Sequence, residues 1–330
     1  MNVKRILVAG GAGFIGSNFI RYMLNKYQNY RLINLDKLTY AGNLDNLEDV
    51  ASDPKYAFVR GDIAEGALVE QLFGEGVDYI VNFAAESHVD RSIIEPDLFV
   101  RTNVVGTQVL LQAAYRHRIK KYVQISTDEV YGSLEETGLF TEDSPLLPNS
   151  PYSASKAGAD LLVRAYHMTY GVPVNITRCS NNYGPYQHPE KLIPLFVANA
   201  LEDKELPLYG DGRNVRDWLH VLDHCRAIDL VMHRGKNGEI YNVGGNNEQS
   251  NLEITRLILG ILGKPESIIK FVADRPGHDR RYAVDAGKIQ GDLGWQPGYD
   301  FVRGIKETVR WYVENRDWWQ KVRAGRLVSA

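Results

Sequence analysis

Short apolar runs alternate along the first half of the chain with longer segments in which apolar residues follow a helical spacing. The apolar runs, which are candidate strands, lie at 5–9, 31–35, 56–59, 79–83, 122–125 and 174–177. After the first run, apolar residues such as Phe14, Phe19 and Met23 recur at the spacing of one helix face. Longer helices are expected over about 98–117 and 151–170. This alternation predicts a parallel, doubly wound α/β sheet with right-handed crossovers.

Three glycines, Gly10, Gly13 and Gly16, stand between the first candidate strand and the helix that follows it. In that context glycines allow a tight turn, close approach of the backbone to a pyrophosphate, and a helix N-terminus aimed at the phosphate charge. A plain glycine-rich turn is the alternative, but the next strand ends in Asp36, about 20 residues further on, where an acid suits ribose hydroxyls. The pattern predicts a Rossmann-type dinucleotide site and favours NAD over NADP. Lys37 weakens that preference slightly.

Two further strand ends complete the expected cofactor region. The run at 56–59 leads to Asp62 and Ile63, where the carboxylate either reaches an adenine or caps a turn. The run at 79–83 ends at Phe83 and continues into Ala84 and Ala85, whose small side chains would let a cofactor lie against the backbone.

The run at 122–125 continues into a hydroxyl pair and two adjacent acids, Ser126, Thr127, Asp128 and Glu129. Ligands of α/β folds bind at the carboxyl ends of strands, and two neighbouring acids there would destabilise the fold unless function requires them. A solvated turn is the ordinary alternative, and this segment alone leaves both interpretations open.

Tyr152 and Lys156 are four residues apart, so they share one face of the helix predicted over 151–170. An ammonium beside a phenol favours the phenolate and lowers its pKa from about 10, which makes a base for a sugar hydroxyl. The pair alone is a weak signal, because such residues often pack on helix surfaces. Its position after the glycine motif and after Ser126 and Thr127 strengthens it, since those hydroxyls would bind the same substrate oxygen.

Together these motifs resemble the extended short-chain dehydrogenase/reductases and, among them, the dTDP-glucose 4,6-dehydratases. The similar segments span nearly the whole chain and read GGAGFIGSNF, DKLTYAGN, NFAAESHVDRS, ISTDEVYG, SPYSASKAGAD, RCSNNYGPYQHPEKLIPL, RDWLHVLDH and DRPGHDRRYAVD. The most specific is Thr127-Asp128-Glu129, because the 4-epimerases and decarboxylases of the superfamily keep the Tyr and Lys but usually lack the acid pair.

The resemblance implies a lyase that makes dTDP-4-keto-6-deoxy-glucose and water from dTDP-glucose, feeding deoxysugars such as rhamnose. Tyr152 would deprotonate the C4 hydroxyl while NAD takes the C4 hydride, and Glu129 would remove the acidified C5 proton. Asp128, held protonated, would donate to the departing C6 hydroxyl before the hydride returns to C6. NAD should therefore stay tightly bound. A nucleotide-sugar 4-epimerase, a 4,6-dehydratase acting on a uridine sugar and a non-catalytic NAD-binding sensor are the alternatives.

By the same resemblance, the residues expected to bind NAD are Gly10, Gly13, Phe14, Ile15, Gly16, Asp36, Lys37, Leu38, Thr39, Asp62, Ile63, Phe83, Ala84, Ala85, Ser87, Thr102, Tyr152, Lys156 and Asn182. Those expected to bind the nucleotide sugar are Ser87, Thr127, Asn181, Lys191, Leu192, Pro207, Leu208, Tyr209, Arg216, Asn251, Asp274, Arg275 and His278. The catalytic set is Thr127, Asp128, Glu129, Tyr152 and Lys156. Plainer interpretations exist for two of these residues. Arg216 could form a surface ion pair with Asp217, and Asn251 lies in a capping box that begins at Ser250.

The resemblance further implies an NAD-binding domain at 1–180 with a return segment at about 215–248. A smaller C-terminal α/β domain, at 181–214 and 249–330, would bind the nucleotide sugar. A homodimer is expected through the helices at about 98–117 and 153–170. Relatives carry a Tyr near the C-terminus that touches the nucleotide, whereas this chain has Leu327. The choice between thymidine and uridine therefore stays open.

Composition narrows the classes of partner. The 330 residues include 38 basic and 41 acidic ones, well mixed, with a net charge of −3, which argues against nucleic acid or an anionic membrane as the main partner. The N-terminus lacks the pattern of a signal peptide, and no apolar stretch has the length of a membrane span. Two cysteines, Cys179 and Cys225, give neither a disulfide framework nor a metal-site spacing. We expect a cytoplasmic enzyme without a metal.

Overall fold

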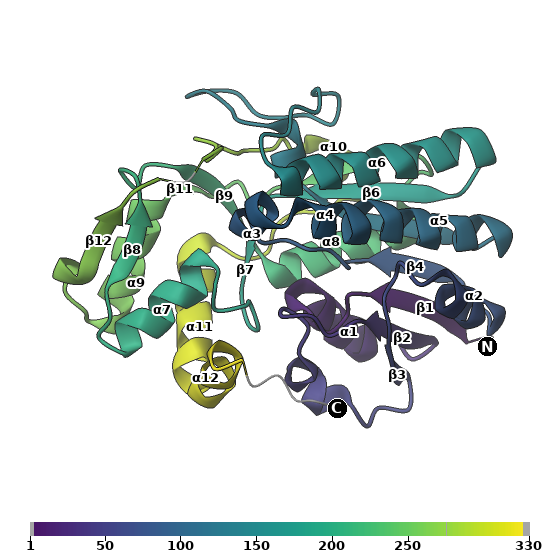
Figure 1. The fold of residues 1–330 in the computed structure, drawn as a ribbon, viewed down its shortest axis with the longest axis horizontal. Coiled ribbons are helices and arrows are strands. Elements are labelled where there is room, and N and C mark those ends of the chain that lie inside the picture. The colour runs from purple at the N-terminus through teal and green to yellow at the C-terminus, as the bar shows by residue number, and fades with distance from the viewer. Residues whose placement is uncertain (1–2, 275, 326–330) are drawn as a thin grey trace.

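Seven parallel strands form the main sheet of the protein, in the order β10-β6-β5-β4-β1-β2-β3 (Figure 1). The computed structural model describes residues 3–274 and 276–325. The strands are β1 (Lys4–Ala9), β2 (Tyr30–Asp36), β3 (Tyr56–Arg60), β4 (Tyr79–Asn82), β5 (Lys121–Thr127), β6 (Val174–Cys179) and β10 (Ile240–Val243). The first six are the predicted strands, and the predicted doubly wound α/β fold is confirmed.

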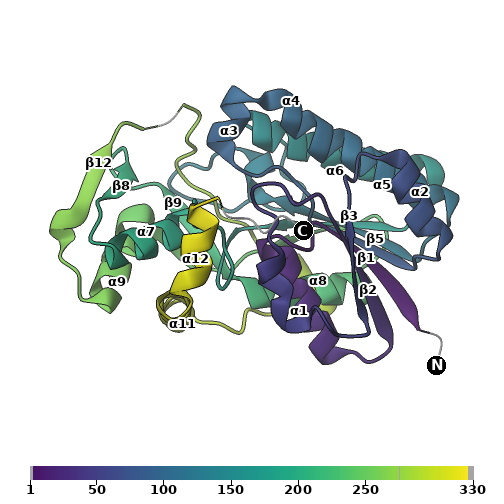
Figure 2. The same cartoon turned by 60° about the horizontal axis from the view of Figure 1, so that its bottom comes forward.

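Helices cover both faces of this sheet because successive side chains of each strand point to opposite faces. Ile6 and Val8 of β1 pack with one face's helices, α1 (Phe14–Lys26), α8 (Val221–Arg234) and α10 (Gly287–Leu293). Leu7 and Ala9 pack with the other face's helices, α2 (Gly66–Gly74), α5 (Thr107–Arg116) and α6 (Pro151–Tyr170). Figure 2 shows the two helical layers on either side of the sheet. The sheet is thereby held between two apolar cores, which fixes the positions of its strand ends.

A smaller part of the molecule stands beside the carboxyl ends of the main strands. It contains a three-stranded sheet, β11-β9-β7, and a two-stranded one, β12-β8. Their bounds are β7 (Asn181–Tyr183), β8 (Leu206–Tyr209), β9 (Val215–His220), β11 (Glu248–Ser250) and β12 (Ile269–Val272). The helices are α7 (Leu192–Leu201), α9 (Asn251–Leu262), α11 (Phe301–Glu314) and α12 (Arg316–Arg323). A separate apolar core joins them. The predicted domain boundaries stay a prediction.

The helix predicted over about 98–117 is confirmed in position as a continuous helical run over 96–116, but its middle part is π-helical rather than α-helical. The chain forms α3 (Val89–Ile94), α4 (Pro96–Phe99), a π-helical segment η2 (Val100–Gly106) and then α5. The wider turn of η2 contains Asn103, whose buried amide exchanges two hydrogen bonds with the backbone of Glu86 (2.9 and 3.1 Å) and donates a third to Ser155 Oγ (2.8 Å). Apolar periodicity could not reveal this polar anchor.

The capping box predicted at Ser250 is confirmed. Ser250 and Glu253 form the reciprocal capping box at the start of α9. The apolar face of α11, with Phe301, Ile305 and Tyr312, is buried. Short 3-10 segments, η1 (Leu44–Val50), η3 (Asp128–Tyr131) and η4 (Glu266–Ile268), join the longer elements. Within the described ranges, no helix has the length and apolar character needed to cross a membrane.

Candidate active site

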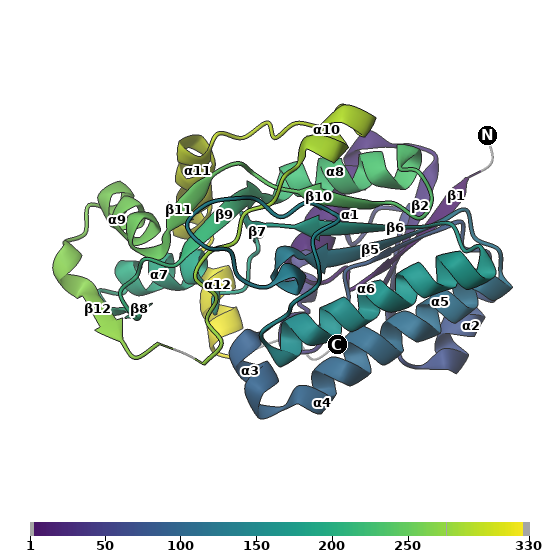
Figure 3. The ribbon, with the colours of Figure 1, turned by 90° about the horizontal axis from the view of Figure 1, so that it is seen from above.

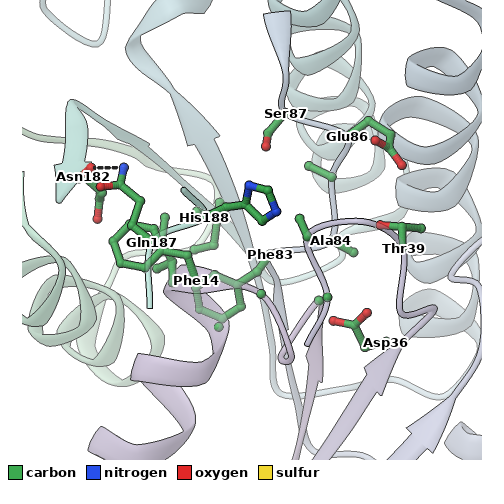
Figure 4. Close-up of a pocket in the computed structure, with 18 of the residues that line it drawn as sticks. Phe14, Asp36, Thr39, Phe83, Ala84, Glu86, Ser87, Asn182, Gln187 and His188 are labelled. Atoms are coloured by element: carbon green, nitrogen blue, oxygen red, sulfur yellow. Dashed lines mark hydrogen bonds between the residues drawn. The ribbon is translucent and has the colours of Figure 1, made fainter. Parts of the chain in front are cut away.

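A cleft opens at the carboxyl ends of β1, β2, β4, β5 and β6 and is lined on its other side by residues from 180–191 and from α12. All five predicted catalytic residues line it. So do the predicted cofactor residues, apart from Leu38. Figure 4 shows Asp36 and Thr39 on one side of the cleft and Asn182 and Gln187 on the other. Residues that the sequence separates by more than 100 positions therefore meet in one cavity.

The glycine loop leaves no room for side chains at two positions. Gly10 has a φ of 76°, and a Cβ there would lie 2.5 Å from the backbone nitrogen of Ala84. A Cβ on Gly16 would lie 2.4 Å from the carbonyl oxygen of Gly10. Gly13 begins α1 as its N-cap, and no side chain caps that helix end. The helix start is thus a backbone surface suited to an anion such as a pyrophosphate.

At the end of β2, Asp36 is 9% exposed and held by two backbone N–H donors. Its Oδ2 accepts from Ala12 N (2.9 Å) and its Oδ1 from Leu38 N (2.8 Å). Burial outweighs these bonds and raises the pKa of Asp36. Leu38, which does not line the cleft, orients this carboxylate instead. It is also one of the few non-glycine residues with a positive φ (58°).

Lys37 and Asp62 form an ion pair of 2.9 Å beside Asp36. Asp62 also accepts from Ala64 N (2.9 Å), so both roles considered for it, facing the cleft and capping a turn, are present. The Lys37 charge is already engaged by a carboxylate. It therefore offers less attraction to a 2′-phosphate than the sequence suggested.

The acid pair is not a solvated turn. Thr127 ends β5 and caps η3, its Oγ1 accepting from Glu129 N (3.3 Å), and this turn places both acids on the cleft wall. Asp128 is 2% exposed, and its Oδ2 has no hydrogen-bond partner within the described residues. Burial raises the pKa of Asp128 well above its usual range, and the neighbouring charges of Glu129 and Asp217 raise it further. This environment favours the protonated form of the Asp128 carboxyl.

Tyr152 and Lys156 lie on the buried face of α6, one turn apart, as predicted. Lys156 Nζ donates to the Ile125 carbonyl at 2.6 Å. The expected lowering of the Tyr152 pKa is wrong for the protein by itself. Burial raises that pKa well above its usual range, and Glu129 adds to the rise, whereas a hydrogen bond with Thr127 opposes it. Burial also lowers the pKa of Lys156.

The sequence of this chain is similar to those of known sugar-nucleotide dehydratases. The family model for GDP-mannose 4,6 dehydratase matches residues 7–308. A dTDP-glucose 4,6-dehydratase from Actinoplanes sp. is 54% identical over 320 residues, which are 96% of this chain and 99% of the relative. One from Xanthomonas campestris pv. campestris is 54% identical over 338 residues, 97% of this chain and 96% of the relative. The chain belongs to the dTDP-glucose 4,6-dehydratase family.

Solved structures agree with this membership. The dTDP-glucose 4,6-dehydratase of Streptomyces venezuelae, crystallised with NAD bound, is 56% identical with a TM-score of 0.94, covering 96% of this chain and 99% of that one. A UDP-glucose 4-epimerase from Thermotoga maritima has a TM-score of 0.88 but only 29% identity, over 94% of this chain and 99% of its own. Fold alone therefore does not separate dehydratases from epimerases, and the residues at the site must.

The residues predicted to bind substrate divide into two groups. Ser87, Thr127, Asn181 and Lys191 line the cleft, and Lys191 Nζ donates to the Ser87 carbonyl (3.0 Å). The others that the structure describes do not line it and belong to the smaller part of the molecule, namely Leu192, Pro207, Leu208, Tyr209, Arg216, Asn251, Asp274 and His278. Arg275 and Leu327 lie outside the described residues.

The surface ion pair considered for Arg216 is wrong. Arg216 is 6% exposed, and its guanidinium donates to the carbonyls of Val215 and Asp279 and stacks over the Tyr282 ring at 4.3 Å. Asp217 instead accepts from backbone N–H groups of the segment after β10. The positive charge of Arg216 lowers the pKa of Asp128 against the larger effect of burial, so Arg216 acts on one of the two predicted catalytic acids.

Sequence reasoning missed several cleft residues of this family member. Gln187, Glu190 and Trp318 line the cleft. Tyr282 does not line it but lies near Glu129: burial raises the pKa of its phenol, and the Glu129 charge raises it further. Gln187 and Glu190 lie within the segment RCSNNYGPYQHPEKLIPL, so their closeness in sequence to Asn181 and Lys191 could have indicated them. Nothing in the pattern around Trp318 marks it as a site residue.

Proposed function

We propose that this protein converts dTDP-glucose to dTDP-4-keto-6-deoxy-glucose and water. The observation that carries the proposal is the buried Asp128 beside Glu129 at the end of β5, facing the same cleft as Tyr152. A 4-epimerization needs the Tyr and Lys alone. Elimination of water needs an acid and a base together, and the acid must hold its proton near neutral pH.

NAD is the cofactor of this proposal, and the cleft fits it. The glycine positions that a Cβ would fill bring the backbone close to a pyrophosphate, and the fixed Asp36 carboxylate meets ribose hydroxyls while repelling a 2′-phosphate. When bound, NAD accepts a hydride from the sugar and returns it within the same turnover. The protein's part is to hold the reacting atoms in place and to move protons.

Tyr152 takes the proton of the C4 hydroxyl in this proposal, and Thr127 orients the same oxygen. Because burial raises the pKa of Tyr152, its phenolate needs stabilisation by positive charge. In this proposal that charge comes partly from the bound ligands and partly from Lys156 on the same helix face. Oxidation at C4 makes the C5 proton acidic. A base on the neighbouring turn then removes that proton.

Glu129 is that base, and Asp128 is the acid. Glu129 accepts the C5 proton while Asp128 donates its proton to the departing C6 hydroxyl, which leaves as water. The two adjacent carboxyls can share this work because burial and mutual repulsion hold Asp128 in its protonated form. Thr127, which caps the turn, fixes both side chains relative to Tyr152.

The nucleotide sugar is proposed to extend from the cleft onto the smaller part of the molecule. Lys191 in the cleft and the buried Arg216 offer the positive charge that a diphosphate requires. Asn251, at the capped start of α9, and the Tyr209–His278 ring pair at 6.1 Å lie further out in the same part. Thymidine is the proposed base, with uridine as the alternative.

The direct test is to incubate the purified protein with dTDP-glucose and, in parallel, with UDP-glucose, without added NAD, and to weigh the products. Loss of 18 mass units, the mass of water, from the dTDP sugar is expected. A C4-inverted hexose of unchanged mass would identify an epimerase. Faster dehydration of the UDP sugar would assign a uridine substrate.

The proposal extends to assembly and location. A homodimer through η2, α5 and α6 is supported by large apolar side chains that these elements expose, among them Val100, Val105, Leu161 and Met168. The cofactor domain at 1–180 with 215–248, and the substrate domain at 181–214 and 249–330, are proposed to meet at the cleft. A cytoplasmic location fits the two cysteines, which are both free thiols.

A further inference from the structure

The C-terminal helix α12 forms part of the cofactor cleft, although 272 residues separate its Trp318 from Asn46, which Trp318 contacts there. Trp318 and Val322 line the cleft together with the glycine loop and Asn46 of η1. Figure 2 shows α12 standing between the smaller part of the molecule and α1. The helix therefore spans the opening between the two parts on the side of the glycine loop.

Hydrogen bonds fix Trp318 to that loop. Its indole Nε1 donates to Asn46 Oδ1 at 2.9 Å, and Asn46 Nδ2 donates to the Ala12 carbonyl at 2.9 Å. One amide side chain thus joins α12 to the residue between Gly11 and Gly13, and turning that amide around would break both bonds. Lys321 on the next turn lies 3.8 Å from Asp45.

An edge-to-face contact between two rings also holds this helix. Tyr186, which also lines the cleft, packs against Trp318 with ring centroids 5.7 Å apart, and the Arg21 guanidinium of α1 lies 4.2 Å from its ring centroid. Tyr186 has a φ of 67°, a conformation that a bulky residue adopts only where its surroundings impose it. These contacts connect three elements around the cleft, namely α1, α12 and the loop that precedes α7.

We propose that Trp318 is a positioning residue for the cofactor, and that α12 acts as a strap that keeps NAD in the cleft from one turnover to the next. This inference rests on the proposed function, in which NAD is regenerated in each cycle and gains nothing by exchanging. A dinucleotide on the glycine loop shares its cavity with Trp318. Departure would then require the Trp318–Asn46–Ala12 connection to open.

The test measures exchange of bound cofactor. The full-length protein is loaded with isotopically labelled NAD, chased with unlabelled NAD, and sampled by rapid gel filtration. Trp318→Ala should release label roughly tenfold faster than wild type, and Trp318→Phe, which keeps the ring but removes the N–H donor, should fall between them. Asn46→Ala, which breaks both bonds, should resemble Trp318→Ala. Turnover of these variants should become dependent on added NAD.

Gln320→Ala is the matched control, because Gln320 is exposed on the opposite side of the same helix. It should exchange label at the wild-type rate. Unchanged exchange in both Trp318→Phe and Asn46→Ala would overturn the strap, as would activity lost without any change in exchange or NAD dependence. A wild-type protein that retains no label at all would instead contradict the proposed function, so the two failures are distinguishable.

Discussion

At the scale of single residues, the site depends on two adjacent carboxyls whose surroundings differ. Asp128 is almost fully buried, whereas Glu129 is partly exposed in the cleft. Backbone geometry enforces this difference, because the 3-10 turn capped by Thr127 directs neighbouring side chains differently. A general acid and a general base can therefore arise from the same kind of chemical group on two adjacent residues.

Glu129→Gln tests the proposed base. The amide cannot accept the C5 proton, so exchange of that proton with deuterated solvent should stop and turnover should fall by about 10²- to 10⁴-fold. Proton NMR of the recovered sugar nucleotide measures the exchange. Glu136→Gln, on an exposed loop residue, is the control and should exchange normally. Normal exchange in Glu129→Gln would show that another group is the base.

Asp128→Asn tests the acid and has a consequence for stability. C5 exchange should persist while water loss slows, because an amide cannot give up a proton. The raised pKa of Asp128 means that the folded state binds a proton more tightly than the unfolded chain does. Stability is therefore lost as the pH rises above the unfolded pKa of about 3.9, by about 1.4 kcal/mol for each tenfold difference in proton affinity.

The variant removes this penalty, so Asp128→Asn should melt at a higher temperature than wild type at pH 7, with the difference shrinking towards pH 4. Thermal unfolding followed by circular dichroism at the two pH values measures it. Asp143→Asn, at an exposed carboxylate, should leave the melting temperature unchanged. A lower melting temperature for Asp128→Asn at pH 7 would contradict a protonated Asp128.

At the scale of elements, apolar patterning predicts the strands well and the polar anchors poorly. The six strand positions follow from short apolar runs, most of which are buried on both faces, and the capping box at Ser250 follows from local hydrogen-bonding chemistry. The π-helical η2 does not follow, and neither do the hydrogen bonds of its Asn103, whose partners lie 17 and 52 positions away in the sequence. Trp318 escapes prediction for the same reason, since its partner lies 272 residues distant.

The raised pKa of Tyr152 marks a further limit. Spacing predicts that Tyr152 and Lys156 share a helix face, which is confirmed, but it carries no information on how completely the phenol is buried. The degree of desolvation is a property of the closed cleft. It therefore appears only once the elements are assembled.

Asn103→Ala tests the anchor in η2. Loss of the amide leaves the N–H and carbonyl of Glu86 without a buried partner and removes the hydrogen bond that Ser155 Oγ accepts, which should lower the free energy of unfolding by about 1–3 kcal/mol in urea titrations. Asn25→Ala, at an exposed position of α1, is the matched control and should change stability little. Equal midpoints for the two variants would show that η2 does not depend on the amide.

At the scale of the whole molecule, one helical layer has two functions in the proposal. The inner faces of α5 and α6 pack on the sheet and place Tyr152 and Lys156, while their outer faces present large apolar side chains. Figure 3 shows the two helices side by side along one face of the molecule, with α3 and α4 beside them. Leu161 is 58% exposed and Met168 66% exposed on α6. Several exposed large apolar side chains on neighbouring helices are typical of a surface that another subunit covers.

Leu161→Glu should therefore yield a monomer. In a two-fold symmetric contact each substitution appears twice, and two new carboxylates would be forced into one apolar interface, which costs more than the contact provides. Light scattering coupled to size-exclusion chromatography measures the mass, with about twice the chain's 37.2 kDa expected for wild type. Leu147→Glu is the control, because Leu147 is 63% exposed but lies outside these helices, and it should stay dimeric. A wild-type monomer at micromolar concentration, or a dimer that survives Leu161→Glu, would place the subunit contact elsewhere or remove it.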